Sequence, residues 1–132
     1  MKKLLLLLAF IVPMSCNAQT AQTDATKSKD LPRFTIVQST IAVKLTFKLD
    51  TYTGNVYQLV VDANGKNLWQ LMTRIPTSLP DIRYDGTRNY SLFVSTLGMR
   101  YTYLFNTNTG ATWNLVENTD TKAEFFEPMD DK

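Results

Sequence analysis

The chain has 132 residues, of which 44% are hydrophobic and 20% are charged, and it contains one Cys and no His. This length predicts a single domain, and the composition is that of a globular protein. The counts exclude a His general base, a zinc site built from His and Cys, and a disulfide framework.

Residues 1–18 are predicted to be a secretory signal peptide. Lys2 and Lys3 precede nine uninterrupted apolar residues at positions 4–12, and Pro13 ends that run. The run is about half as long as the ~20 apolar residues that a membrane-spanning helix needs. We therefore expect a cleaved leader, export to the periplasm or beyond the cell, and no membrane span after cleavage.

The sequence is compatible with two ways of processing the leader. Small side chains before Gln19 favour cleavage after Ala18, whereas Ser15 also suits the position before a lipidated Cys16, which would make the protein a lipoprotein. Loss of the leader removes two lysines, so that 14 basic residues become 12 and equal the 12 acidic ones. A neutral mature chain gives no electrostatic reason to expect a nucleic-acid partner.

The mature chain is predicted to be a tandem repeat. Residues 19–30 are polar and aperiodic, which indicates a disordered spacer before a β domain over residues 31–132. A shift of 56 residues aligns positions 33–72 with 89–128 without a gap and gives nine identical pairs. Aromatic residues stay in register in this alignment, as in the pair Tyr57 and Trp113. We interpret this pattern as two copies of one unit joined by an irregular crossover at residues 73–88.

Each unit is predicted to be a four-stranded antiparallel meander, because its apolar residues alternate along short segments. The expected strands include residues 34–38, 44–50, 56–61 and 68–72 in the first unit, and 112–117 and 123–127 in the second. In the second strand of each unit, the side chains expected to face the core are Leu45, Phe47 and Leu49, and then Tyr101, Tyr103 and Phe105.

A four-stranded sheet cannot cover its own apolar face, so the two units are expected to pack together. The fold class that follows is all-β, a small sandwich with pseudo-twofold symmetry, and a closed barrel is the alternative. Under that symmetry, Tyr57 and Trp113 should occupy equivalent and largely buried sites.

The turns have a recognisable chemistry. Residues 50–54 and 106–110 both begin with Asp or Asn and end with Gly, so an acidic or amide side chain can accept turn N–H groups while Gly adopts a positive φ. Asn64-Gly65 predicts a further hairpin turn. A calcium loop beginning at Asp62 would need a Glu at its twelfth position, which is Thr73 here.

Residues 47–57 and 103–113 share the pattern Phe/Tyr-x-Leu/Phe-Asp/Asn-Thr-x-Thr-Gly-x-x-Tyr/Trp. This hairpin is similar to blades of quinoprotein-type β-propellers, although the aromatic residue there usually follows the Gly by four positions instead of three. A propeller needs about four blades, so closure within this one chain is excluded. The hairpin more closely resembles that of short bacterial secreted proteins of unassigned activity, over about residues 33–125, and this resemblance implies no particular reaction.

No convincing catalytic pair of carboxylates is present in the sequence. The acidic residues of the crossover and the last hairpin are interpreted as a solvated face: Asp81, Asp85, Glu117, Asp120, Glu124 and Glu127. Tyr52, at a hairpin tip, and Tyr84, in the crossover, are the predicted binding residues, because exposed rings beside polar groups suit contacts with sugars or proteins. No catalytic residue, metal ligand or cofactor is predicted.

We therefore expect a non-enzymatic exported module that binds a protein or glycan, or takes part in assembly of the cell envelope, through its turn tips and strand edges. A homo-oligomer is compatible with this expectation. The alternative is a small carbohydrate-binding or carboxylate-dependent hydrolytic domain. A groove lined by Tyr52, Tyr84 and a pair of carboxylates would favour that alternative.

Overall fold

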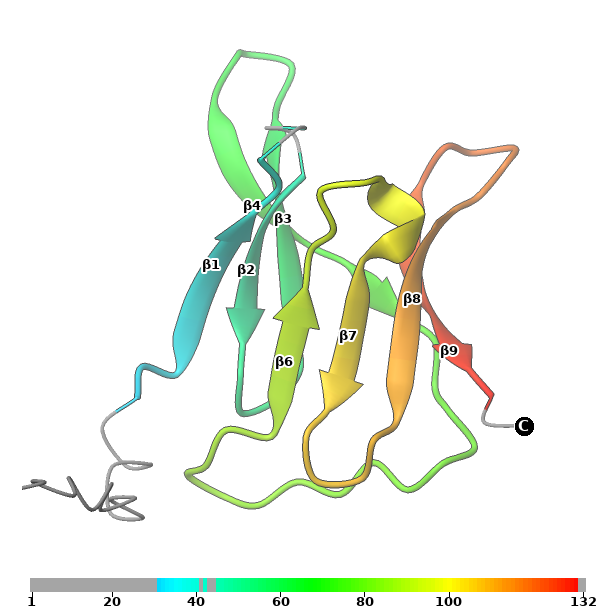
Figure 1. Ribbon diagram of the computed structural model, residues 1–132. Coiled ribbons are helices and arrows are strands. Elements are labelled where there is room, and N and C mark those ends of the chain that lie inside the picture. Colours follow the sequence, from blue (N-terminus) through cyan, green and yellow to red (C-terminus); the bar gives the residue numbers. More distant parts are fainter. Residues whose placement is uncertain (1–30, 41, 43–44, 131–132) are drawn as a thin grey trace, which may run out of the picture.

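The computed structural model describes residues 31–40, 42 and 45–130, and the predicted signal peptide, the spacer and Cys16 lie outside these residues. The described chain forms two sheets (Figure 1). Sheet A has the order β1 (Phe34–Gln38), β2 (Thr46–Asp50), β3 (Val56–Val61) and β4 (Asn67–Leu71). Sheet B has the order β5 (Thr73–Arg74), β9 (Glu124–Met129), β8 (Thr112–Glu117), β7 (Tyr103–Asn106) and β6 (Tyr90–Phe93). A short 3-10 helix, η2 (Met99–Tyr101), precedes β7.

The predicted all-β class is confirmed. Strands β1 to β4 form one antiparallel meander and β6 to β9 form a second, and the two sheets pack as a small, partly curled sandwich. The strands predicted at residues 34–38, 56–61 and 112–117 begin and end where the alternation of apolar residues placed them. No helix in the described part of the chain is long and apolar enough to cross a membrane.

The two long hairpin turns have the same hydrogen bonds. Asp50 Oδ1 accepts the N–H of the residue two places on at 3.0 Å, and Asn106 Oδ1 does the same at 2.8 Å. The N–H of Gly54 and of Gly110 donates to the carbonyl of that Asp or Asn, at 2.8 Å in both turns. Both glycines have a positive φ, +74° and +79°. The predicted turn chemistry is confirmed in both places.

A threonine in each turn ties it to the start of its own meander. The N–H and Oγ1 of Thr51 donate to the carbonyl of Arg33 at 2.9 and 2.7 Å, and those of Thr107 donate to the carbonyl of Asn89 at 2.8 and 3.1 Å. The Thr51 carbonyl in turn accepts the N–H groups of Asn89 and Tyr90, at 2.7 and 3.0 Å. The first turn is thereby joined to the beginning of β6, and the sheets are held together at this end.

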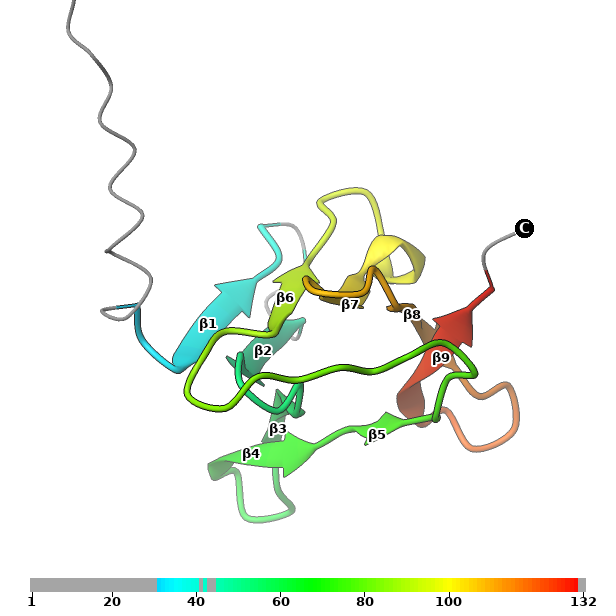
Figure 2. The same ribbon diagram turned by 90° about the horizontal axis from the view of Figure 1, so that it is seen from below.

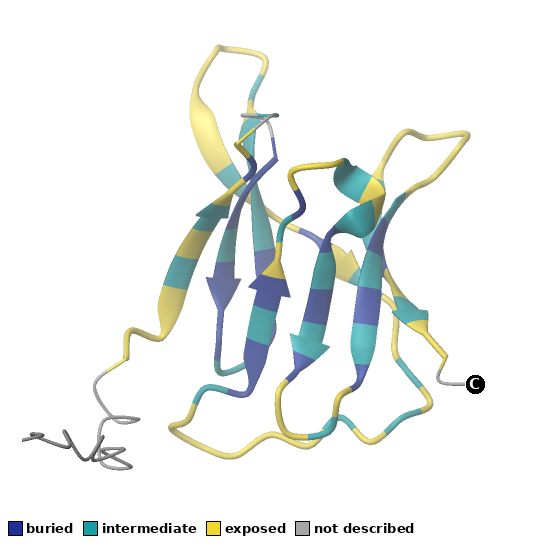
Figure 3. Ribbon diagram, in the orientation of Figure 1, coloured by how far each residue is buried: buried dark blue, intermediate teal, exposed yellow. Residues whose placement is uncertain are grey.

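The core lies between the sheets and is richest on β2, β6, β7 and β8 (Figure 3). Leu45, Phe47 and Leu49 are buried as predicted. Facing them from sheet B are the buried side chains of Tyr90, Leu92, Leu104, Trp113, Leu115 and Phe126.

The prediction for the inward face of the second meander is wrong. Tyr101, Tyr103 and Phe105 are only half-buried, and Leu104, on the opposite face of β7, is fully buried instead. In the first meander the alternate face carries Lys48, and an unpaired ammonium is costly to bury, so Phe47 and Leu49 point inward instead. The strands of the second meander carry no lysine on either face, and Leu104 is on the face that packs against Phe47 and Leu49 in the core.

The expected equivalence of Tyr57 and Trp113 is wrong as well. Trp113 is 1% exposed in the core, whereas Tyr57 is half-buried on the outer side of sheet A. A twofold relation would bury the same face of both meanders, because rotation preserves the face that points inward. The burial pattern therefore contradicts the predicted pseudo-twofold: the meanders meet through opposite faces.

The predicted irregular crossover contains one strand. β5 leaves sheet A directly after β4 and pairs in parallel with β9, with Thr73 opposite Phe125 and Arg74 opposite Phe126. The crossover then runs back beneath the ends of the strands to β6 (Figure 2). On its way the Ile75 carbonyl accepts a hydrogen bond of 2.8 Å from the Trp113 indole. The crossover is thus part of the packing between the sheets.

Candidate functional site

The structure brings Tyr52 and Tyr84 to one open hollow, which we call the tyrosine hollow. It has a volume of about 440 Å³ and lies where the first hairpin turn, the start of the chain's first strand and the crossover meet. Its lining consists of Arg33, Tyr52, Thr53, Arg83, Tyr84, Asp85, Gly86 and Asn89. Two residues predicted separately from the sequence therefore belong to one site.

Tyr52 is presented by the first hairpin turn. Gly54 closes this turn at a φ of +74°, and Asp50 accepts the N–H of Tyr52, so the backbone that carries the ring is fixed. The sequence predicted Tyr52 to be exposed, but its side chain is half-buried. The guanidinium of Arg33 lies 5.4 Å from the centre of the Tyr52 ring and covers part of it.

Arg33 is itself held by Asp50. Its Nε and Nη2 donate to the two carboxylate oxygens at 3.0 and 2.6 Å, which is the two-point geometry that favours arginine over lysine. Burial opposes ionisation of Asp50, but the hydrogen bonds from Arg33, from the Tyr52 N–H and from Thr53 outweigh it and leave the pKa of Asp50 below its ordinary value. The same hydrogen bond with Asp50 raises the pKa of Arg33. This pair adds no net charge to the hollow.

Asn89 connects the segments that form the hollow. It is 1% exposed, and its Nδ2 donates to the carbonyls of Tyr52, Tyr84 and Thr87 at 3.0, 3.0 and 3.1 Å. Its Oδ1 accepts the N–H of Tyr84 and the Nδ2 of Asn108, both at 2.8 Å. One buried amide thus sets the spacing between the two tyrosine backbones.

The crossover forms a tight turn around Tyr84. Gly86 has a φ of +67°, and Thr87 Oγ1 donates to the Tyr84 carbonyl at 2.9 Å. The Tyr84 side chain is 58% exposed, as the sequence predicted for a ring in the crossover. Neighbouring Asp81 does not line the hollow and accepts hydrogen bonds from Tyr90 and Asn106. Asp81 therefore anchors the crossover, and Asp85 is the carboxylate that lines the hollow.

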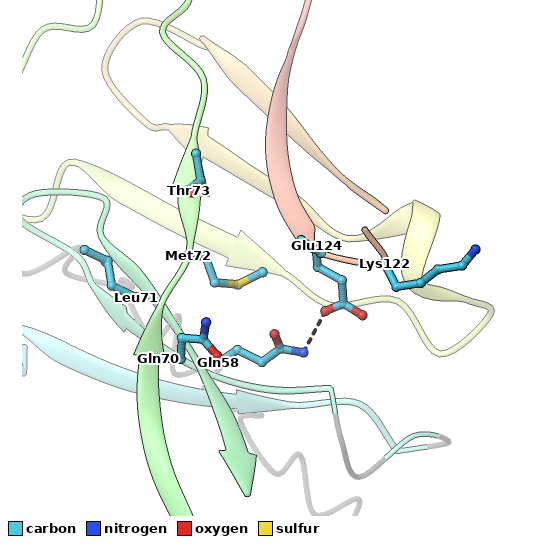
Figure 4. Close-up of a pocket in the computed structure, with 8 residues that line it drawn as sticks. Gln58, Gln70, Leu71, Met72, Thr73, Lys122 and Glu124 are labelled. Carbon is cyan, nitrogen blue, oxygen red and sulfur yellow. Dashed lines mark hydrogen bonds between the residues drawn. The ribbon is translucent and has the colours of Figure 1, made fainter. Parts of the chain in front are cut away.

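A second hollow of about 340 Å³ lies at the opposite edge of the sandwich, between β4, β5 and the start of β9 (Figure 4). Gln58 Nε2 donates to Glu124 Oε2 at 2.6 Å across it, which links the two sheets. Its lining contains no aromatic ring: Gln58, Gln70, Leu71, Met72, Thr73, Lys122, Ala123 and Glu124. We take the tyrosine hollow as the candidate site because it alone of the two offers ring faces to a ligand.

Sequence reasoning missed Arg33, Arg83 and Asn89. A signal for two of them was present, since Arg33 and Asn89 are the first pair of the 56-residue alignment, directly before the first strand of each meander. The pair of carboxylates that would favour the hydrolytic alternative is not assembled among the residues that line the hollow, because Asp85 lines it without Asp81. Glu124 lines the second hollow.

Within the described residues, no three His, Cys, Asp or Glu side chains gather in a way that could hold a metal ion. Comparisons of the chain with protein-family models, with curated proteins and with solved structures find no match.

Proposed function

We propose that this protein is an exported, non-enzymatic binding domain that holds an uncharged saccharide in the tyrosine hollow. The observation that carries the proposal is the convergence of two tyrosine rings and several hydrogen-bonding side chains, from three segments of chain, on one open hollow. Export follows from the predicted signal peptide, and lipidation at Cys16 remains the alternative route to the cell envelope.

The chemistry of the lining suits a sugar. One side of a sugar ring is made of C–H groups and packs on an aromatic face, while the hydroxyls around its rim need donors and acceptors. Tyr84 supplies an exposed ring with a polar tip, and Arg83, Asp85 and Thr53 supply donors and acceptors beside it. Binding sites of this kind fix orientation with a few polar groups around an apolar surface.

The charges of the lining favour an uncharged ligand. Arg33 is neutralised by its two-point contact with Asp50, and Arg83 shares the hollow with Asp85. A strongly acidic ligand would meet Asp85, and a strongly basic one would meet Arg83. A neutral saccharide has no such opposition.

Binding is favoured over hydrolysis of the saccharide. Glycoside hydrolysis uses two carboxyl groups on either side of the bond, one of which acts as a proton donor. Asp85 lines the hollow, and the nearby Asp50 is committed to Arg33 with its pKa lowered, so it stays ionised at neutral pH. This arrangement supports recognition of a sugar without cleavage.

The test is binding of the mature protein to an array of neutral and acidic oligosaccharides, followed by calorimetric titration of the best binder. Tyr84→Ala should weaken binding at least about tenfold, which is the loss of one well-placed ring contact. Tyr101→Ala is the control, because it also removes a tyrosine ring but from η2, at the opposite end of the strands (Figure 1).

Three results would contradict the proposal. One is equal affinity of Tyr84→Ala and the unmodified protein, and another is a consistent preference for acidic over neutral sugars. The third is release of new reducing ends during incubation with the bound oligosaccharide, which would make the protein an enzyme.

A further inference from the structure

Each sheet has an inner side in the core and an outer side on the molecular surface. In the 56-residue alignment, the outer side of sheet A corresponds to the inner side of sheet B, and the outer side of sheet B corresponds to the inner side of sheet A. The turn hydrogen bonds fix the correspondence, since Asp50 and Asn106, and Gly54 and Gly110, make the same contacts 56 residues apart. We name the side of sheet A that points away from the core outer face A, and its residues include Phe34, Ile36, Lys48, Tyr57, Leu59 and Trp69. We name the corresponding side of sheet B outer face B, and its residues include Phe93, Tyr103, Phe105, Thr112 and Val116.

Outer face A has buried counterparts in the core. Adding 56 to its residue numbers gives Tyr90, Leu92, Leu104, Trp113 and Leu115, which are 0–8% exposed. Trp69 lies opposite Leu59, and Phe126 lies opposite Leu115, so Phe126 is the counterpart of Trp69 in the sheet. On outer face A itself, Ile36 is 66% exposed and Phe34 is 50% exposed.

Outer face B likewise has buried counterparts, and these lie on the inner side of sheet A. Tyr103, Phe105 and Thr112 correspond to Phe47, Leu49 and Val56, which form the part of sheet A that covers sheet B inside the molecule. Phe93 and Tyr103 stack on this face with ring centres 6.3 Å apart, and Phe93 is largely exposed. The contact inside the molecule therefore joins a face that corresponds to outer face A to a face that corresponds to outer face B. Outer face A and outer face B themselves stay uncovered in each molecule.

The carbonyl groups of Thr51 and Thr107 also differ, although they hold equivalent positions in the two turns. The Thr51 carbonyl accepts the N–H groups of Asn89 and Tyr90, which begin the second meander. The equivalent carbonyl, that of Thr107, receives no hydrogen bond from the described residues. In a continued series, its donors would be the N–H groups at the start of another first meander, at Arg33 and Phe34.

We propose that outer face B of one molecule binds outer face A of a second copy, so that the contact between the sheets is repeated between molecules. The two contacting faces are different, so each added copy again presents one free face of each kind. The sheets inside the molecule diverge from the neighbourhood of β2 and β6 toward β4 and β9 (Figure 2). A repeated contact between unlike faces gives a closed ring when its rotation closes and an open filament when it does not. The divergence of the sheets favours closure, and we expect a closed ring of a few chains. This inference does not depend on the saccharide proposal.

Lys48 limits the strength of the contact. It stands where Leu104 stands in the core, and its ammonium lies 4.5 Å from the centre of the Tyr57 ring and 5.1 Å from that of Trp69. The two rings can hold the charge at the edge of a contact, but its partial dehydration costs free energy that a leucine would not. The contact between molecules is consequently weaker than the one inside.

The experiment is sedimentation velocity and native mass spectrometry of the mature protein over a range of concentrations. We expect one discrete oligomer with a mass that is a whole multiple of the chain. Ile36→Lys on outer face A and Phe105→Lys on outer face B should each abolish it. Ile82→Lys is the matched control, because Ile82 is an exposed isoleucine of the crossover and lies on neither face.

A mixture of the two variants distinguishes this contact from one between like faces. Ile36→Lys keeps outer face B and Phe105→Lys keeps outer face A, so the mixture should form a 1:1 dimer although neither variant associates alone. Circular dichroism of each variant verifies that it is folded, and Tyr103→Lys replaces Phe105→Lys if the latter is not. Lys48→Leu should lower the dissociation constant about tenfold, as expected when a charge at a contact gives way to the leucine of the internal one.

The proposal is overturned if the unmodified protein stays monomeric at its highest soluble concentration, or if the variants do not complement each other in the mixture. Growth without a limiting size would refute the closed ring.

Discussion

Tyr90 donates a hydrogen bond of 2.5 Å from its hydroxyl to Oδ1 of Asp81, and thereby joins β6 to the crossover. Burial opposes ionisation of Asp81, but the hydrogen bonds from Tyr90 and Asn106 and the charges of Arg74 and Arg83 outweigh it and lower the pKa of Asp81. Burial and the contact with Asp81 raise the pKa of Tyr90.

These shifts predict how stability depends on pH. A carboxyl group with a lowered pKa in the fold contributes stability above its ordinary pKa of 3.8, and that contribution is lost as the pH falls through the lower folded value. Tyr90, with a raised pKa, contributes below its ordinary pKa of 10.0 and loses this contribution at higher pH. Urea unfolding between pH 2 and 11 should therefore show a loss of stability at about pH 4 and below and another at about pH 10 and above.

Asp81→Asn is the variant that tests the acid limb. It should lower stability at pH 7 and make the loss below pH 4 shallower, with the remaining acid loss contributed by Asp50, the pKa of which is also lowered. An acid limb as steep as that of the unmodified protein would mean that Asp81 does not carry the effect.

The two turn glycines should respond differently to a methyl group. Both have a positive φ, which costs about 1–2 kcal/mol in an alanine. A Cβ on Gly54 would also lie 2.6 Å from Nη1 of Arg74 and 2.8 Å from the ring of Tyr90, whereas no atom lies within 4 Å of one on Gly110. Gly54→Ala should therefore lower the free energy of unfolding by about 3 kcal/mol or more and Gly110→Ala by about 1 kcal/mol, as measured by urea denaturation. Equal losses would show that crowding at Gly54 is relieved without cost.

Trp113 and Tyr57 hold the same position in their hairpins but should contribute differently to the free energy of unfolding. Trp113→Ala should cost about 3–5 kcal/mol, because it empties a site in the core. Tyr57→Ala removes a half-buried ring from outer face A and should cost less than about 1 kcal/mol in the monomer. Urea unfolding at a dilution where the chain does not associate gives both values, and similar losses would contradict the opposite burial of the two rings.

Local chemistry in the sequence predicts much of this fold. The alternation in residues 34–38, 56–61 and 112–117 sets those strands, and the Asx and glycine residues set the turns. The choice of buried face could not be predicted in the same way, because Tyr103 and Leu104 are both apolar and the choice depends on what the other meander presents.

Only those residues of the candidate site that have a local signal in the sequence could be predicted. Tyr52 and Tyr84 could be found individually, because each is an aromatic residue in a polar turn. Asn89 could not, because its role comes from three carbonyls that are brought together only in the folded chain.

Asn89→Ala should affect both stability and the tyrosine hollow. It removes the hydrogen-bond partners of the Tyr84 N–H and of the Tyr52 carbonyl, at a cost of about 1–3 kcal/mol. The spacing of Tyr52 and Tyr84 should loosen as well, so saccharide binding should fall together with stability. Asn108→Ala is the control, since it removes one hydrogen bond to Asn89 from an exposed residue and should cost about 1 kcal/mol or less. Calorimetry and urea unfolding measure the two effects, and an unchanged affinity in Asn89→Ala would separate this residue from the site.

The parallel pairing of β5 with β9 sets an order of events during synthesis. A chain made from its N-terminus completes β1 to β4 first, and these strands can pair with one another while Phe47 and Leu49 remain uncovered on one side of the sheet. Residues 73–74 find their partners only when residues 125–126 have been made. The last strand therefore enters sheet B between β8 and β5 and brings Phe126 into the core at the same moment. A nascent chain that stops before residue 124 leaves β8 as an unpaired edge and part of the apolar core uncovered, and both favour aggregation.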